Sequence, residues 1–149
     1  MRIVVDTNIV FSAILNTNNK IAQILLKPKS NLNFYSTEQL LSEIKDHKNK
    51  LKKFSDYSDE ELDRIIEIIT KRIRFINVKL ISAECYHKAE ALAQDVDIDD
   101  TEFIALTEHL KAKLWSGDKE LQRGLKKKGW EKFIVTSELV GSKAHRKEI

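Results

Sequence analysis

Four acidic residues stand at separated points of the sequence where they could act together on a metal ion: Asp6, Glu43, Asp100 and Asp118. Asp6 directly follows the apolar run of residues 3–5, and a charge at such a place is seldom incidental. Carboxylates that cluster repel one another and are driven toward protonation. A divalent cation such as Mg²⁺ or Mn²⁺ prefers oxygen ligands and removes that penalty. One or two such ions can activate water for attack on phosphorus and stabilise the leaving oxygen.

The pattern between these acids predicts the framework that would bring them together. Short apolar runs alternate with amphipathic segments, which favours an α/β fold with a parallel sheet covered on both faces. In such sheets, sites form at the carboxyl ends of the strands. The expected strands are 3–5, 33–36, 74–77, 113–116 and 133–136, and the expected helices are 8–15, 21–26, 38–54, one beginning at 58, 82–94, one beginning at 99 or 100, and 119–128.

Helix-capping residues give these elements their expected starts. Ser36 or Thr37 can cap the helix over 38–54, and Ser58 with Glu61 forms a capping-box pattern for the next one. These two helices are expected to form a charged hairpin that projects from the sheet. Asp99, Asp100 and Asp118 have an alternative reading as helix caps alone.

Composition places the chain among single-domain globular proteins. It has 149 residues, 42% of them hydrophobic and 33% charged, with a net charge of +3 that does not by itself indicate nucleic-acid binding. With 1 Pro and 4 Gly, few residues interrupt regular structure, so helices should dominate. The 1 Cys excludes an internal disulfide and suggests a reducing, cytoplasmic setting. No stretch approaches the roughly 20 apolar residues that span a bilayer, so no membrane partner is expected. We expect one domain over 1–141 and a polar tail over 142–149.

Once the acids are laid out, the chain resembles the PIN-domain family of nucleases. Val5-Asp6-Thr7-Asn8-Ile9 is similar to that family's opening strand motif. The segments 36–44, 97–106 and 114–121 resemble its second, third and fourth acidic segments. The likeness covers nearly the whole chain in the right order. It implies a three-layer fold with a five-stranded parallel sheet and endonucleolytic cleavage of RNA with Mg²⁺ or Mn²⁺.

The resemblance also implies partners. Many small stand-alone members are toxins of toxin–antitoxin pairs of the VapC type, which commonly form homodimers. They are silenced by a small antitoxin that inserts into the active-site groove. The short chain and the Ser-Gly-Asp-Lys segment at 116–119 look like that group.

Within the resemblance, some roles stay open. In the third segment the spacing to Phe103 favours Asp100 as the direct metal ligand, with Asp97 or Asp99 in support. Asp118 could act through water. Three polar residues could orient ligands or the scissile phosphate, or equally cap their own turns: Thr7, Asn8 and Ser116.

A basic segment begins beside the last acid. Lys119, Arg123 and Lys126 could follow an RNA backbone, because phosphate neutralisation supplies most non-specific affinity. The alternative is an ordinary solvated helix face.

Two other functions compete with a nuclease. One is a phosphoryl-transfer enzyme that uses Asp6 as the nucleophile. Dehalogenase-like phosphatases need a second Asp where this chain has Asn8, and a receiver domain needs an Asp where the third strand ends in Asn77. The other is a non-catalytic PIN-like module that binds RNA or protein, against which the presence of all four acids argues.

Overall fold

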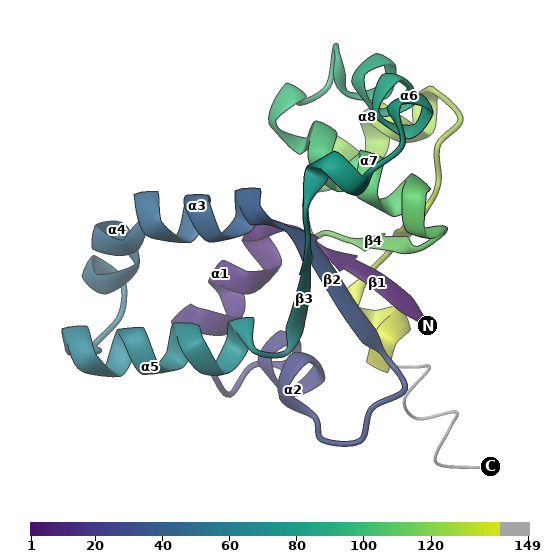
Figure 1. Ribbon diagram of the computed structural model, residues 1–149. Coiled ribbons are helices and arrows are strands. Elements are labelled where there is room, and N and C mark those ends of the chain that lie inside the picture. The colour runs from purple at the N-terminus through teal and green to yellow at the C-terminus, as the bar shows by residue number, and fades with distance from the viewer. Residues whose placement is uncertain (141–149) are drawn as a thin grey trace.

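The sheet is the centre of the structure. In the computed structural model, which describes residues 1–140, five parallel strands are flanked by helices (Figure 1). The strands are β1 (Arg2–Val5), β2 (Asn33–Thr37), β3 (Ile73–Ile76), β4 (Lys113–Trp115) and β5 (Phe133–Ile134). This confirms the predicted α/β fold with its five-stranded parallel sheet. The expected tail at 142–149 lies outside the described residues.

The order of the strands opens a crevice beside β1. The order is β3-β2-β1-β4-β5, so the chain moves outward from β1 on one side and then continues on the other. Ile3, Val4 and Val5 are fully buried, as the central strand of a two-sided parallel sheet requires. Val5 pairs with Trp115 on β4, so the residues after each strand leave the sheet side by side. The crevice at such a reversal of strand order is where ligands bind in open α/β sheets.

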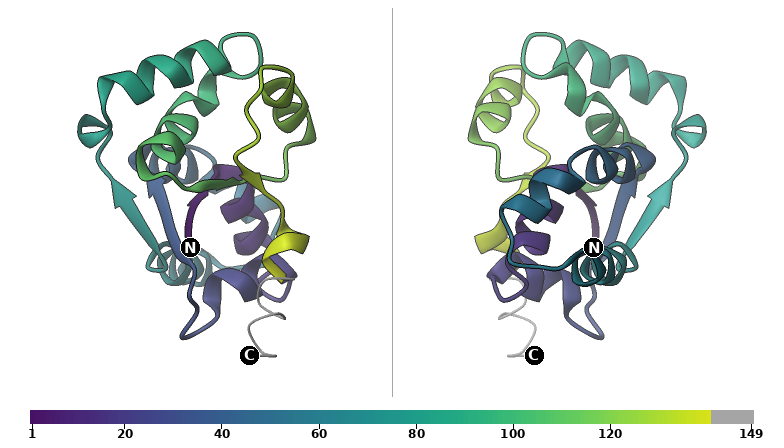
Figure 2. Two further views of the ribbon diagram at one scale, coloured as in Figure 1. Left: turned by 90° about the vertical axis from the view of Figure 1, so that its right-hand side faces the viewer. Right: turned by 90° about the vertical axis from the view of Figure 1, so that its left-hand side faces the viewer.

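Helices cover the two faces of the sheet. Figure 2 shows α6, α7 and α8 gathered on one side and α1 and α2 on the other. Helix α7 packs on β1 and β2 and buries Phe103, Ile104 and Leu106. The helices are α1 (Thr7–Leu15), α2 (Lys20–Leu26), α3 (Glu38–Asp46), α4 (Lys48–Lys53), α5 (Asp59–Thr70), α6 (Ala83–Ala93), α7 (Thr101–Leu110) and α8 (Lys119–Lys127), with 3₁₀ turns η1 (Val78–Leu80) and η2 (Ile98–Asp100). Among the residues described, no helix is long and apolar enough to cross a membrane.

Helices α3, α4 and α5 form the expected hairpin, which projects from the sheet (Figure 1). Lys48 pairs with Asp63, and Lys52 Nζ lies 2.7 Å from Asp59 Oδ1, so ion pairs join its two arms. The prediction of one helix over 38–54 is wrong, because the chain breaks at His47 (φ −104°, ψ 13°). There the His47 ring packs on Phe11, 5.6 Å between ring centroids, and this contact with α1 is invisible to local sequence pattern.

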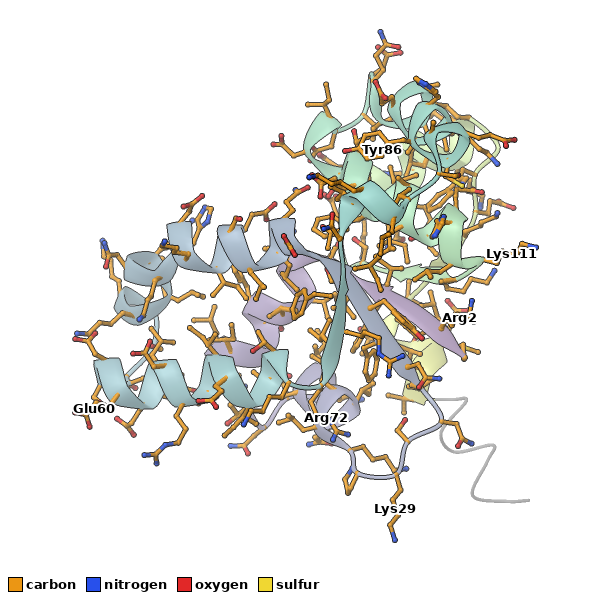
Figure 3. The ribbon with its side chains drawn as sticks, viewed as in Figure 1. Arg2, Lys29, Glu60, Arg72, Tyr86 and Lys111 are labelled. Atoms are coloured by element: carbon orange, nitrogen blue, oxygen red, sulfur yellow. The ribbon has the colours of Figure 1, made fainter. Side chains whose placement is uncertain are left out.

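One arginine joins the base of the hairpin to α2. Arg72, labelled in Figure 3, lies between α5 and β3. Its guanidinium donates to the carbonyl oxygens of Leu25, at 3.1 Å, and Lys27, at 2.6 Å. Both carbonyls lie at the C-terminal end of α2, where no following helical turn supplies an N–H donor for them.

Of three local predictions, two differ from the structure and one is confirmed. The Ser36 hydroxyl donates to the Val5 carbonyl at 2.9 Å, and Thr37 is the N-cap residue of α3 without a side-chain hydrogen bond, so neither side chain caps that helix. The capping box of Ser58 and Glu61 is confirmed. The strand expected over 133–136 ends at Ile134, and residues 136–140 are helical. The Thr136 hydroxyl accepts from Trp115 Nε1 at 3.0 Å, a tertiary contact that turns the chain away from the sheet.

Helix α8 packs closely on the segment that follows α6. Gly124 on α8 faces Val96, and a Cβ at position 124 would lie 2.6 Å from Val96 Cγ1. Lys128 at the end of α8 donates to the carbonyls of Ala91 and Leu92. This close approach sets the distance between Asp118, which starts α8, and Asp97, which directly follows Val96.

We expect Gly124→Ala to destabilise the protein by about 1–3 kcal/mol, the usual cost of overpacking, despite the better helix propensity of alanine. Val96→Ala in the same chain should recover most of that loss because it removes the atoms that the new Cβ meets. Urea denaturation of the two single variants and the double variant measures the coupling. Additive effects, or a Gly124→Ala protein as stable as the parent, would contradict this packing.

Candidate functional site

A cleft of about 410 Å³ opens at the carboxyl ends of β1 and β4. All four acids singled out from the sequence line it, together with both supporting candidates of the third segment. Its lining comes from α1, α3, η2 and the start of α8, which are far apart in sequence. The lining residues are Asp6, Thr7, Asn8, Gln39, Glu43, His47, Asp97, Asp99, Asp100 and Asp118.

Three of these carboxylates lie close enough to share one ion. Asp97, Asp100 and Asp118 each offer an oxygen, and these atoms all lie within 4.8 Å of one another. The structure therefore groups Asp97, rather than Asp99, with Asp100. Asp99 instead contributes its backbone carbonyl to a hydrogen bond with Gln39.

Of the three acids with a helix-cap alternative, Asp118 caps a helix with its side chain, whereas Asp99 lies within η2 and Asp100 makes no cap bond. Asp97 Oδ1 accepts from the Asp99 N–H at 3.0 Å and caps η2. Asp118 Oδ1 accepts from the N–H groups of Glu120 and Leu121, and this caps α8. Asp100 occupies the N-cap position of α7 but makes no side-chain cap bond. A capping role therefore does not explain why the Asp100 carboxylate lies in the cleft. Asp97 and Asp118 use one carboxylate oxygen for capping, and the second oxygen of each can still bind a ligand.

Asp6 is the most buried of the acids, at 4% exposed. Its Oδ1 accepts from the Ile9 N–H at 3.1 Å, so it starts α1. Burial, followed by the charges of Asp118 and Glu43, raises the pKa of Asp6 to about 6, against the hydrogen bonds from Ser116 and Ile9, which lower it. A carboxyl in this state gains strongly from a nearby cation.

Asp100 is more strongly perturbed. Burial is the largest cause, followed by the charges of Asp97, Asp6 and Asp118, and together they raise the pKa of Asp100 to about 8. Perturbations from desolvation and like charges in one cleft are typical of functional sites. Asp6 and Asp100 are thus two carboxyl groups whose ionisation is unfavourable unless positive charge lies beside them.

Sequence reasoning missed Gln39, which connects two walls of the cleft. Its Nε2 donates to Glu43 Oε1 at 2.6 Å and to the Asp99 carbonyl at 2.7 Å, joining α3 to η2. The i, i+4 spacing of Gln39 and Glu43 on α3 was the signal that could have found it. His47 lies one turn after Glu43. It is exposed and lines the cleft, and its Nδ1 lies 2.9 Å from the Glu43 carbonyl oxygen.

The three polar residues near the acids have different surroundings. The Ser116 hydroxyl accepts from the Asp118 N–H at 3.1 Å, so it shapes the turn before α8. Asn8 is exposed at the cleft wall. Thr7 is 7% exposed, and its Oγ1 has no hydrogen-bond partner within residues 1–140. An unsatisfied hydroxyl on a cleft wall fits a site that receives an oxygen-rich ligand.

Comparison with known proteins decides the family. The PIN domain family model matches residues 4–139. The chain belongs to the PIN-domain family. The PIN domain of this chain is similar in fold to the crystal structure of VapBC2 from Rickettsia felis bound to a DNA fragment from their promoter, with a TM-score of 0.63 and 18% identity over 91% of this chain and 97% of that one. A search of curated proteins gives no significant match.

PIN domains are generally nucleases, and the acidic cluster that such chemistry uses is present in this PIN domain. The family assignment argues against the alternative of a dehalogenase-like or receiver-type phosphoryl-transfer enzyme. The basic residues of α8 line a neighbouring groove and not the acidic cleft of the PIN domain: Lys119, Arg123 and Lys126.

We expect the metal-free PIN domain to lose stability as pH rises from about 4 to about 8. The ordinary pKa of Asp100 is 3.8 and its folded value is about 8, so between them the folded state holds a proton that the unfolded state has released. Raising the pH in that window therefore favours unfolding. Asp100→Asn removes this ionisation. In EDTA at pH 8 the variant should be more stable than the parent by about 2 kcal/mol, since solvent reaches part of this side chain and screens it.

Urea denaturation at pH 5, 6.5 and 8 measures this difference. Asp95→Asn is the matched control, because Asp95 lies in the same segment with its side chain 83% exposed. Equal stability of the parent at pH 5 and pH 8 in EDTA would contradict the expected ionisation of the cluster.

Proposed function

We propose that this PIN domain is a metal-dependent endoribonuclease that hydrolyses RNA phosphodiester bonds with Mg²⁺ or Mn²⁺. The observation that carries the proposal is the cleft in which the carboxylates of Asp97, Asp100 and Asp118 lie within reach of one ion. Carboxylate oxygens are the ligands that these hard cations prefer. Bound there, a divalent cation supplies Lewis-acid activation of the phosphodiester and offsets the charge of the cluster.

Each catalytic residue in the proposal has a role set by its contacts. Asp100 ligates the cation directly, with Asp118 beside it and Asp97 in support. Asp6, held by Ile9 and Ser116, adds charge from the floor of the cleft. Glu43 lies on the opposite wall, where Gln39 orients its carboxylate. Asp99 supports the site through the Gln39 hydrogen bond of its carbonyl.

The substrate strand needs positive charge next to this acidic cleft. Lys119 directly follows Asp118, and Arg123 lies one turn further along α8. Lys126 pairs with Glu131 at 3.8 Å, but both side chains are about 70% exposed, and such pairs contribute little. These three cations are the proposed RNA-backbone contacts. Thr7, Asn8 and Ser116 are the proposed groups that orient the scissile phosphate.

Purified protein is expected to cleave single-stranded RNA in Mg²⁺ or Mn²⁺ and to stop in EDTA. Asp6→Asn and Asp100→Asn should each lower kcat/KM by about 100-fold or more, since even groups that only support a metal ligand typically contribute about 10–100-fold. Asp95→Asn should cleave at the parent rate. Gel analysis of end-labelled RNA measures the rates, and circular dichroism checks the fold. Parent rates from both cleft variants would show that the metal site is wrongly assigned, and a parent protein that cuts no RNA would leave a non-catalytic binding module as the function.

We also propose that the protein is the toxin of a toxin–antitoxin pair, acts in the cytoplasm and forms a homodimer. The similarity in fold to VapBC2 supports this proposal. Induced expression in bacteria should reduce colony counts, and Asp100→Asn should restore them. Co-expression of a short open reading frame next to the gene should also restore growth, because its product would cover the cleft. Light scattering of the purified chain tests the dimer. Equal counts for parent and empty vector would contradict the toxin role.

A further inference from the structure

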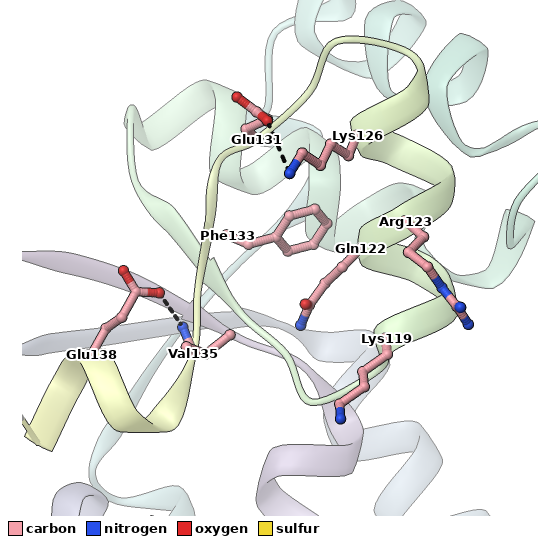
Figure 4. Close-up of a pocket in the computed structure, with 8 residues that line it drawn as sticks. All are labelled: Lys119, Gln122, Arg123, Lys126, Glu131, Phe133, Val135 and Glu138. Carbon is pink, nitrogen blue, oxygen red and sulfur yellow. Dashed lines mark hydrogen bonds and ion pairs between the residues drawn. The ribbon is translucent and has the colours of Figure 1, made fainter.

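A second hollow lies beside the acidic cleft, between α8 and β5. It measures about 520 Å³, within the range of about 300–1,000 Å³ typical of small-molecule sites. We call it the α8–β5 groove. Figure 4 shows Lys119 and Gln122 reaching from α8 toward the strand, with the Phe133 ring between the two walls. Its lining residues are Lys119, Gln122, Arg123, Lys126, Glu131, Phe133, Val135 and Glu138.

We propose that the α8–β5 groove binds one unstacked nucleobase of the single-stranded RNA substrate on the ring of Phe133. This inference rests on the proposed ribonuclease function and adds a subsite to it. The groove continues from the cleft, because Asp118 lines the cleft and the next residue, Lys119, lines the groove. Gln122 Nε2 donates to the Ser116 carbonyl at 2.9 Å, so the same turn shapes both.

The floor of the groove suits a base. Phe133 is half-buried, and its ring is held by perpendicular packing on Trp130, with 4.9 Å between ring centroids. An aromatic ring fixed in this way is a stacking platform that accepts any base, because every base has a π face. The Gln122 amide nitrogen is engaged by Ser116, which leaves its oxygen to accept a hydrogen bond from a base N–H.

The charges of the groove favour a polyanion. Its lining holds three cations, Lys119, Arg123 and Lys126, against two acids, Glu131 and Glu138, and Glu138 accepts from the Val135 N–H at 3.1 Å (Figure 4). Lys119 and Arg123 are exposed and have no ion-pair partner in the part of the chain that the structure describes. They are therefore available to the phosphates on either side of a base seated on Phe133.

The test measures binding of a fluorescein-labelled single-stranded oligoribonucleotide by anisotropy in EDTA, where cleavage is suppressed. Phe133→Leu should weaken binding about tenfold, in line with base–aromatic stacking. Phe75→Leu is the matched control, because Phe75 is half-buried on β3, the opposite edge strand, and it should leave affinity unchanged. Arg123→Gln should reduce the slope of log binding constant against log salt concentration by the amount expected for about one phosphate contact. Lys113→Gln should leave that slope unchanged.

An abasic scan of the oligoribonucleotide tests the subsite without changing the protein. The parent should lose affinity at one position, and Phe133→Leu should be insensitive there. A flat scan would overturn the proposal, as would parent affinity in a folded Phe133→Leu variant. The proposal would also be overturned if Phe133→Leu bound RNA normally but no longer bound the product of the neighbouring open reading frame. That result would assign the groove to a protein partner. If affinity depends on the abasic position but the protein cuts no RNA, the nucleobase subsite is supported and the proposed ribonuclease function is refuted.

Discussion

The burial and mutual repulsion of carboxylates crowded at the carboxyl ends of β1 and β4 is the constraint on which the rest of the structure depends. Backbone N–H groups offset part of this unfavourable negative charge. Asp6 and Asp118 each begin a helix, where the unpaired N–H groups and the helix dipole favour negative charge. Asp100 has no side-chain cap bond, and it is the acid whose pKa rises furthest, to about 8. The remaining unfavourable charge is what a divalent cation would offset.

Holding the cluster together requires contacts between elements that are distant in the chain. Gln39 joins α3 to η2, and the close approach of Gly124 to Val96 joins α8 to the segment that leads into Asp97. The hairpin of α3, α4 and α5, anchored through Arg72, carries the Glu43 wall of the cleft. The acids are thus positioned by packing on three sides rather than by any one loop.

Opposite charges lie next to each other along α8. The acidic cleft ends at Asp118, and the cations of the α8–β5 groove begin at the following residue. A net charge of +3 conceals this division, because it averages two surfaces of opposite sign. A polyanion bound in the groove would meet the carboxylates only where a cation offsets their charge.

The sequence by itself determined the fold class and the acids that meet in the cleft. The apolar run before Asp6 and the alternation of strands and helices record burial and periodicity, which are local properties. The tertiary structure decided the partners of each side chain. It grouped Asp97 rather than Asp99 with Asp100 and the distant Asp118, brought Gln39 to Asp99, placed His47 on Phe11 where the helix breaks, and ended β5 where Thr136 meets Trp115. Each of these outcomes depends on residues far apart in the chain, and a local pattern carries no information about which distant groups will meet.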